Sequence, residues 1–97
     1  MEKSNIEFYQ KCVDVWGVDA QIKMCIEEMS ELTKEFCKYY RKGEMNCEQE
    51  IKDHICEEIA DVQNMIDQMQ MIFGIEKVEE IRKIKIDRTK KLLMEEE

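Results

Sequence analysis

Apolar residues recur every three or four positions along this chain, which is the spacing that places them on one face of an α-helix. One such stripe lies between residues 22 and 40. The longest stripe comprises Ile51, Ile55, Ile59, Val62, Met65, Ile66, Met69 and Ile72. No segment shows β-branched residues alternating with polar residues, which is the pattern of a half-buried strand. The pattern therefore predicts an all-α fold.

Three glycines divide the chain, and it contains no proline. Gly17, Gly43 and Gly74 each follow a periodic segment, where a glycine commonly ends a helix. Asp19 and Asn46 come shortly after two of these stops and are residue types that favour the N-cap position. We expect four helices, at about residues 4–16, 19–42, 47–73 and 76–94.

The length of 97 residues allows one domain, spanning 1–97, with a Glu-Glu-Glu tail at 95–97 that we expect to fray. A monomer of this size buries only about 60–65% of the surface of its unfolded chain, so we expect a homodimer or homotetramer. No run approaches ~18 apolar residues, so no membrane partner is expected. The N-terminus predicts an amphipathic helix rather than a secretory signal, and the expected location is cytoplasmic.

The charge balance is acidic, with 23 Asp and Glu against 15 Lys and Arg and a net charge of −8. A polynucleotide partner is not expected, because phosphate contacts need a basic surface. The five cysteines form no CxxC pair and His54 is the only histidine, so a zinc site is not expected. We expect free thiols in a reducing compartment.

Acidic residues interrupt the apolar stripes at two places. Glu58 lies within the stripe of residues 51–72, and Asp61 follows one turn later at its edge. Glu28 and Glu31 form a second pair at the same spacing on the flank of the stripe of residues 22–40. Four inward carboxylates would repel one another unless a cation neutralised them. An all-oxygen ligand set predicts Mg²⁺ or Mn²⁺.

His54 lies one turn before Glu58 on the same face. The Glu-x-x-His repeat of di-iron bundles is absent, so we expect a structural or supporting role for His54 rather than ligation. Single acids such as Glu27 and Glu35 also fit an ordinary solvated helix surface.

The last predicted helix is basic and carries seven of the fifteen cationic residues. These are Lys77, Arg82, Lys83, Lys85, Arg88, Lys90 and Lys91. Lys85 lies between apolar positions, and Arg88 is one turn away, so we expect both to face inward, opposite the acids. This arrangement of cations opposite acids would suit the binding of a polyphosphate that carries a metal ion. The metal would bridge the carboxylates and the phosphate oxygens, and Lys or Arg would bind the remaining negative charge. The alternative is that the aliphatic part of Lys85 packs against its apolar neighbours while its ammonium group extends into solvent.

The order of these acids resembles a known enzyme family. Glu27-Glu28-Met29-Ser30-Glu31, then 26 residues, then Glu58-Ile59-Ala60-Asp61 is similar to the EExxE and ExxD pair of the MazG-like all-α nucleoside triphosphate pyrophosphohydrolases. Trp16-Gly17 and Gln21-Ile22 precede the first motif, as in compact bacterial and phage members. The resemblance spans about residues 14–92 and implies a four-helix bundle completed by homo-oligomerisation.

The resemblance implies an enzyme that cleaves the α–β phosphoanhydride bond of (d)NTPs, releasing a nucleoside monophosphate and pyrophosphate. In the family, the second and third glutamates of EExxE and both acids of ExxD bind the metal ion. The residues at these positions here, which would bind Mg²⁺, are Glu28, Glu31, Glu58 and Asp61. Glu27 would bind a further metal or orient the attacking water. The expected role is nucleotide-pool house-cleaning.

The family's last helix often carries a Lys-x-x-x-Asn pattern, but Asp87 stands here in place of the asparagine. The resemblance therefore offers Lys83, Lys85 and Arg88 only as candidate phosphate or base contacts. Trp16 and Gln21 are candidate base contacts, although an aromatic residue at a helix end also packs readily in a core or an interface.

The alternative function is a non-catalytic acidic helical module that binds a partner protein. Eight methionines suit such a surface. No seven-residue apolar repeat is sustained, however, and Glu58 and Lys85 occupy positions where a coiled-coil seam would carry apolar residues.

Overall fold

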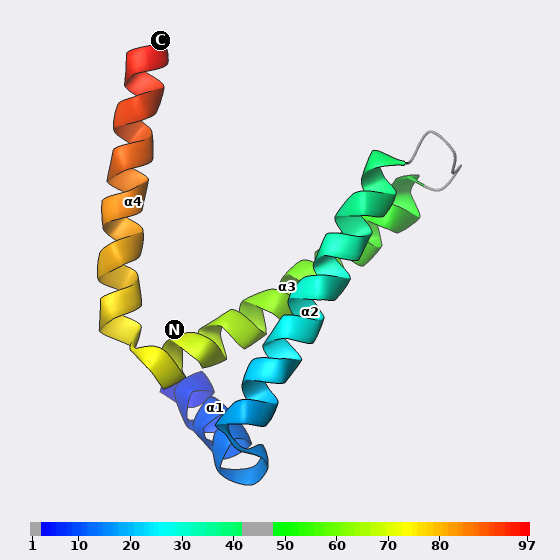
Figure 1. Cartoon of the computed structure of the whole chain (residues 1–97), viewed down its shortest axis with the longest axis vertical. Helices are drawn as coiled ribbons and strands as arrows, with labels where there is room; N and C mark the ends of the chain where they lie inside the picture. Colours follow the sequence, from blue (N-terminus) through cyan, green and yellow to red (C-terminus); the bar gives the residue numbers. More distant parts are fainter. Residues whose placement is uncertain (1–2, 42–47) are drawn as a thin grey trace.

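The computed structural model describes residues 3–41 and 48–97, and every element in these ranges is an α-helix (Figure 1). The helices are α1 (Lys3–Trp16), α2 (Val18–Tyr40), α3 (Glu48–Phe73) and α4 (Ile75–Glu96). No strand occurs among the described residues, so the predicted all-α fold with four helices is confirmed.

Two predicted helix ends, at Gly17 and Gly74, are also confirmed. Their φ angles are +88° and +137°, in a region that glycine adopts without a Cβ clash. The Gly17 N–H donates to the Val13 carbonyl at 2.8 Å and ends α1, while the Gly17 carbonyl accepts from the Gln21 N–H at 3.2 Å and begins α2. One residue thus suffices to turn the chain between two helices.

Other predicted boundaries need correction. Asp19 lies within the first turn of α2 and is not its N-cap, because Gly17 already occupies that position. α4 continues to Glu96, so the tail that we expected to fray is helical almost to its end. α2 ends at Tyr40 rather than at residue 42. Gly43 and Asn46, the other predicted stop and start, lie outside the described residues.

α2 and α3 form the principal pair, and they run antiparallel (Figure 1). α1 packs across one end of this pair, beside the start of α2 and the end of α3. Few apolar residues of the described part of the chain are buried. They are Tyr9, Cys12, Cys25 and Ile51. The core therefore lies along the α2–α3 contact and under α1.

α4 leaves the other three helices and projects away from them (Figure 1). None of its residues is buried, and every residue from Ile81 to the C-terminus is exposed. The prediction that Lys85 and Arg88 face the acids from within one chain is therefore wrong. Only the first turns of α4 meet α3, and the rest of the helix has no neighbour in the described part of the protomer.

Many large apolar side chains remain uncovered in a single protomer. They include Phe8, Trp16, Ile26, Phe73, Leu92 and Leu93, each of which is more than half exposed. No helix in the described ranges combines the length and the apolar character that a membrane crossing requires.

Candidate metal centre

Three carboxylates meet in the middle of the α2–α3 pair. Glu28 of α2 and Glu58 and Asp61 of α3 each place one oxygen within 4.8 Å of the other two. Glu28 and Glu58 are half-buried and Asp61 is exposed, so the cluster opens to solvent on one side. The i, i+3 spacing of Glu58 and Asp61 puts both on the face of α3 that meets α2.

The environment of these acids opposes their ionisation. Desolvation, followed by repulsion from Asp61, Glu58 and other acids, raises the pKa of Glu28. Desolvation, followed by repulsion from Asp61, Glu31 and other acids, also raises the pKa of Glu58. Negative charge is thus concentrated where the protein itself supplies little to neutralise it.

Glu58 carries the clearest sign of an incomplete environment. Its Oε2 atom is buried and accepts no hydrogen bond from any described residue. A buried carboxylate oxygen without a donor is unfavourable, and a divalent cation bound here would supply the missing positive charge. The oxygen-only donor set fits Mg²⁺ or Mn²⁺.

Of the four predicted ligands, the structure brings Glu28, Glu58 and Asp61 together, and Glu31 lies beside them. Glu31 is exposed and is not one of the three converging groups. Its charge nevertheless acts on both Glu28 and Glu58, which places it at the edge of the cluster. Glu27 is exposed, and its charge acts on Glu28.

Glu35, an acid whose position in the sequence also fits a solvated helix surface, is buried. It is only 7% exposed and forms an ion pair with Lys38 at 3.2 Å. His54 Nδ1 lies 4.0 Å from Glu35 Oε2, which accepts no hydrogen bond from a described residue. His54 thus lies beside a buried carboxylate, and Glu35 in turn contributes to the raised pKa of Glu58. The available signal was the four-residue step from Glu31 to Glu35 along one face.

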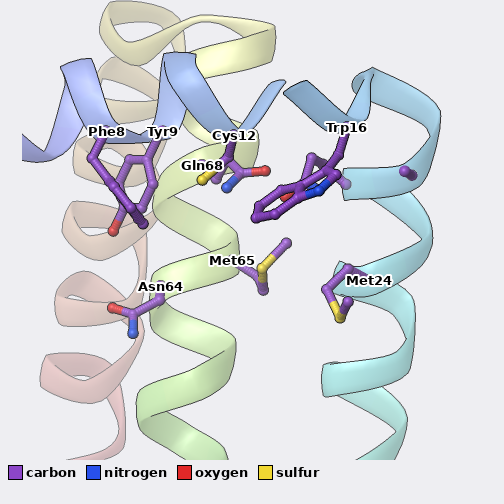
Figure 2. Close-up of a pocket in the computed structure, with 10 residues that line it drawn as sticks. Phe8, Tyr9, Cys12, Trp16, Met24, Asn64, Met65 and Gln68 are labelled. Atoms are coloured by element: carbon purple, nitrogen blue, oxygen red, sulfur yellow. The ribbon is translucent and has the colours of Figure 1, made fainter. Parts of the chain in front are cut away.

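A cavity of about 500 Å³ lies between α1, the start of α2 and the second half of α3 (Figure 2). Two predicted base contacts, Trp16 and Gln21, line it, and Phe8 adds a second exposed aromatic side chain at its rim. Gln68 of α3, which the sequence analysis did not single out, also lines it and is 3% exposed.

The structure does not bring the candidate cations of α4 to the acids. Lys83, Lys85 and Arg88 are all exposed on the projecting helix. Any contact between them and the cluster in the α2–α3 pair has to come from a second chain.

Comparison of the chain with protein-family models, with curated proteins and with solved structures gives no significant match. The functional assignment therefore rests on the chain's own residues, chiefly on the convergence of Glu28, Glu58 and Asp61.

Proposed function

We propose that this chain is a Mg²⁺-dependent nucleoside triphosphate pyrophosphohydrolase of the MazG-like kind, with Mn²⁺ as an alternative ion. The observation that carries the proposal is the meeting of Glu28, Glu58 and Asp61 between two antiparallel helices, with Glu58 Oε2 buried and unpaired among the described residues. These acids occupy the positions of the EExxE and ExxD motifs.

In this proposal Glu28, Glu58 and Asp61 would hold the ion, and Glu31 would complete the set from the edge. The bound ion would neutralise the carboxylates and polarise the phosphate oxygens of the substrate. Glu27, an exposed acid whose charge acts on Glu28, would bind a further metal ion or orient the attacking water, and a carboxylate of the site would accept the proton of that water. Water adds to one phosphorus of the α–β anhydride as the bridging P–O bond breaks, which yields a nucleoside monophosphate and pyrophosphate.

The proposal includes assembly into a homodimer or homotetramer. Leu92 and Leu93 are more than half exposed on α4, which has no buried residue of its own. A second copy would cover these apolar groups. It would also bring Lys83, Lys85 and Arg88 toward the acidic α2–α3 pair of its partner, where they would bind phosphate oxygens. The proposed role is house-cleaning of the cytoplasmic nucleotide pool.

A non-catalytic helical interaction module is the second candidate. The same exposed apolar side chains favour it, because such surfaces mark protein interaction sites. This candidate gives no reason for a buried, unpaired carboxylate oxygen at Glu58.

The deciding experiment measures pyrophosphate and monophosphate release from a panel of ribo- and deoxyribonucleoside triphosphates, with Mg²⁺, with Mn²⁺ or with EDTA. The enzyme proposal requires metal-dependent release of pyrophosphate from at least one of them, and the panel then ranks the bases. A folded oligomer that releases none from any nucleotide would reject this proposal in favour of the interaction module.

A further inference from the structure

The cavity beside Trp16 has an exposed aromatic rim and a buried floor that contains polar groups. Phe8 and Trp16 at the rim are each more than 60% exposed. Tyr9, Gln21 and Gln68 at the floor are each less than 10% exposed. Its volume of about 500 Å³ lies within the usual range for small-molecule sites, about 300–1,000 Å³.

Gln68 gives the floor a specific chemical requirement. Its Oε1 atom is buried and accepts no hydrogen bond from the residues that the structure describes. An unpaired buried acceptor is costly, so such groups are nearly always satisfied in native proteins. Figure 2 shows the Gln68 amide extending from α3 on the side of the cavity where Trp16 lies. The cavity therefore favours an occupant with a hydrogen-bond donor at its inner edge.

The buried amides are in register with the metal-binding acids on both helices. Gln21 precedes Glu28 by seven residues on α2, and Gln68 follows Asp61 by seven residues on α3. Residues at i and i+7 share a helix face. Because the two helices are antiparallel, both amides lie on the same side of the acids. Seven residues of helix span about 10 Å, which suits the reach from a base across a sugar to a triphosphate.

We propose that this cavity binds the heteroaromatic ring of the substrate's base and that Gln68 accepts a hydrogen bond from an N–H group on the edge of that ring. Trp16 provides the aromatic surface against which the ring packs. The assignment rests on the proposed function for the identity of the substrate. The ring contact itself involves neither the acids nor a metal ion.

An apolar side chain from a second copy is the competing occupant, since Phe8 and Trp16 are exposed. Such a side chain would cover the rim but would leave Gln68 Oε1 without a donor. A base satisfies both the aromatic rim and the polar floor, and it is therefore the occupant we commit to.

Trp16 is the only tryptophan in the chain, so its fluorescence reports directly on the cavity. The test titrates the whole protein in EDTA with nucleosides, which lack phosphates. Adenosine is compared with purine riboside, which lacks the amino group, and uridine is compared with 3-methyluridine, which lacks the ring N–H. We expect at least one nucleoside to quench Trp16 and to bind roughly ten-fold more tightly than its partner without the donor.

A matched pair of variants tests Gln68 itself. Gln68→Met keeps the length of the side chain and removes the acceptor, so it should abolish the difference between the paired nucleosides. Gln63→Met makes the same change at an exposed position of α3 that does not line this cavity, and it should preserve the difference. Circular dichroism checks that both variants are helical. If Gln68→Met does not fold, the paired nucleosides still decide the question with the wild-type protein.

Three results would overturn the inference: no quenching by any nucleoside, equal affinity within both pairs, or Trp16 emission that changes only with protein concentration. The last result would assign the cavity to a second copy.

Failure of the base-site inference is distinguishable from failure of the proposed function. Pyrophosphate release without any nucleoside effect on Trp16 rejects only the base site, whereas donor-dependent quenching without turnover rejects only the hydrolase.

Discussion

The side-chain amide of Gln70 donates a hydrogen bond to Glu79 Oε1 at 2.6 Å, across the turn that joins α3 to α4. The same amide donates to the Ile75 carbonyl at 3.4 Å, and Arg82 Nη1 donates to Glu79 Oε1 at 3.0 Å. Gln70 is buried, so this small network holds the first turns of α4 against the end of α3. Together with Gly74, it determines the direction in which α4 leaves.

Replacing Gln70 by alanine should loosen this junction. Hydrogen exchange should become faster in the first turns of α4 and the last turn of α3, while the middle of α2 is unaffected. Gln63→Ala, at an exposed position of the same helix, is the control and should leave exchange unchanged. Equal protection in the two variants would show that the Gln70 contacts do not hold α4.

Acidification should loosen the same junction. Hydrogen bonds from Gln70 and Arg82 lower the pKa of Glu79. The stabilisation that Glu79 contributes is present above the ordinary glutamate pKa and is lost as the pH falls through the lowered value. Amide exchange in the first turns of α4, corrected for its intrinsic pH dependence, should therefore become less protected at strongly acidic pH. Unchanged protection across that range would contradict the role of Glu79.

Ile51 should contribute strongly to the stability of the α2–α3 pair, because it is only 2% exposed. Ile51→Ala should lower the free energy of unfolding by about 2–5 kcal/mol, since it removes buried methyl groups and leaves a cavity. Ile51→Val removes a single methylene and should cost about 0.5–1.5 kcal/mol. Urea unfolding measures both values, and similar small losses would contradict the placement of Ile51 in the core.

Glu58→Gln should abolish turnover while the protein remains helical. The amide keeps the shape of the side chain but removes the charge that holds the cation, and we expect a loss of more than about 100-fold, beyond that typical for outer-shell partners of a metal site. The measurement is pyrophosphate release, with circular dichroism as the check on folding. Glu50→Gln, an exposed position two turns earlier on α3, should retain activity. Full activity in Glu58→Gln would be incompatible with the proposed centre.

The metal-free protein should become less stable as the pH rises from acidic to neutral. The pKa values of Glu28 and Glu58 are raised in the folded state, so each binds protons more readily there than in the unfolded chain. Their contribution to stability is fully present below the ordinary glutamate pKa and is lost as the pH rises through the raised values. Thermal unfolding in EDTA across this pH range measures the effect, and Glu28→Gln and Glu58→Gln should each reduce it.

Mg²⁺ should reverse that loss at neutral pH. An ion that binds only the folded state, present at about 100 times its Kd, stabilises by about 2.7 kcal/mol. The increase in Tm should shrink as the pH falls, because protons compete with the ion for the same carboxylates. A Tm increase that is the same in wild type and Glu58→Gln would indicate binding elsewhere on this acidic chain.

The helices were predictable from the sequence because their causes are local. The 3.6-residue period of apolar positions and the two glycines with positive φ act within a few residues of themselves. The inward position of Glu58 was also predictable, since an acid inside an apolar stripe has to face the neighbouring helix, and Asp61 follows one turn later at the edge of that stripe. Glu28 and Glu31 share the flank of the other stripe, where a small rotation of the helix decides between the interface and solvent, so the sequence could not show that only Glu28 would join the converging groups.

The direction of α4 was not predictable from its own residues. Its apolar positions indicate that a face needs covering, but not whether the cover comes from the same chain. That choice depends on the backbone of Gly74 and on the contact between Gln70 and Glu79. Gln68 and Glu35 were missed for a related reason, because polar residues become buried only through neighbours on other helices. The seven-residue step from Asp61 to Gln68 was the signal available for the first of them.

Because α4 lends no buried side chain to its own protomer, the chain separates two kinds of evolutionary constraint. Substitutions in α1, α2 and α3 alter the folding of the protomer itself. Substitutions along the exposed part of α4 would leave that fold intact and, in the proposed oligomer, would alter only the contacts between copies. If the proposed oligomer forms through α4, a duplicated copy of this protein could diverge in α4 alone and cease to assemble with its parent, without any change to the acids between α2 and α3.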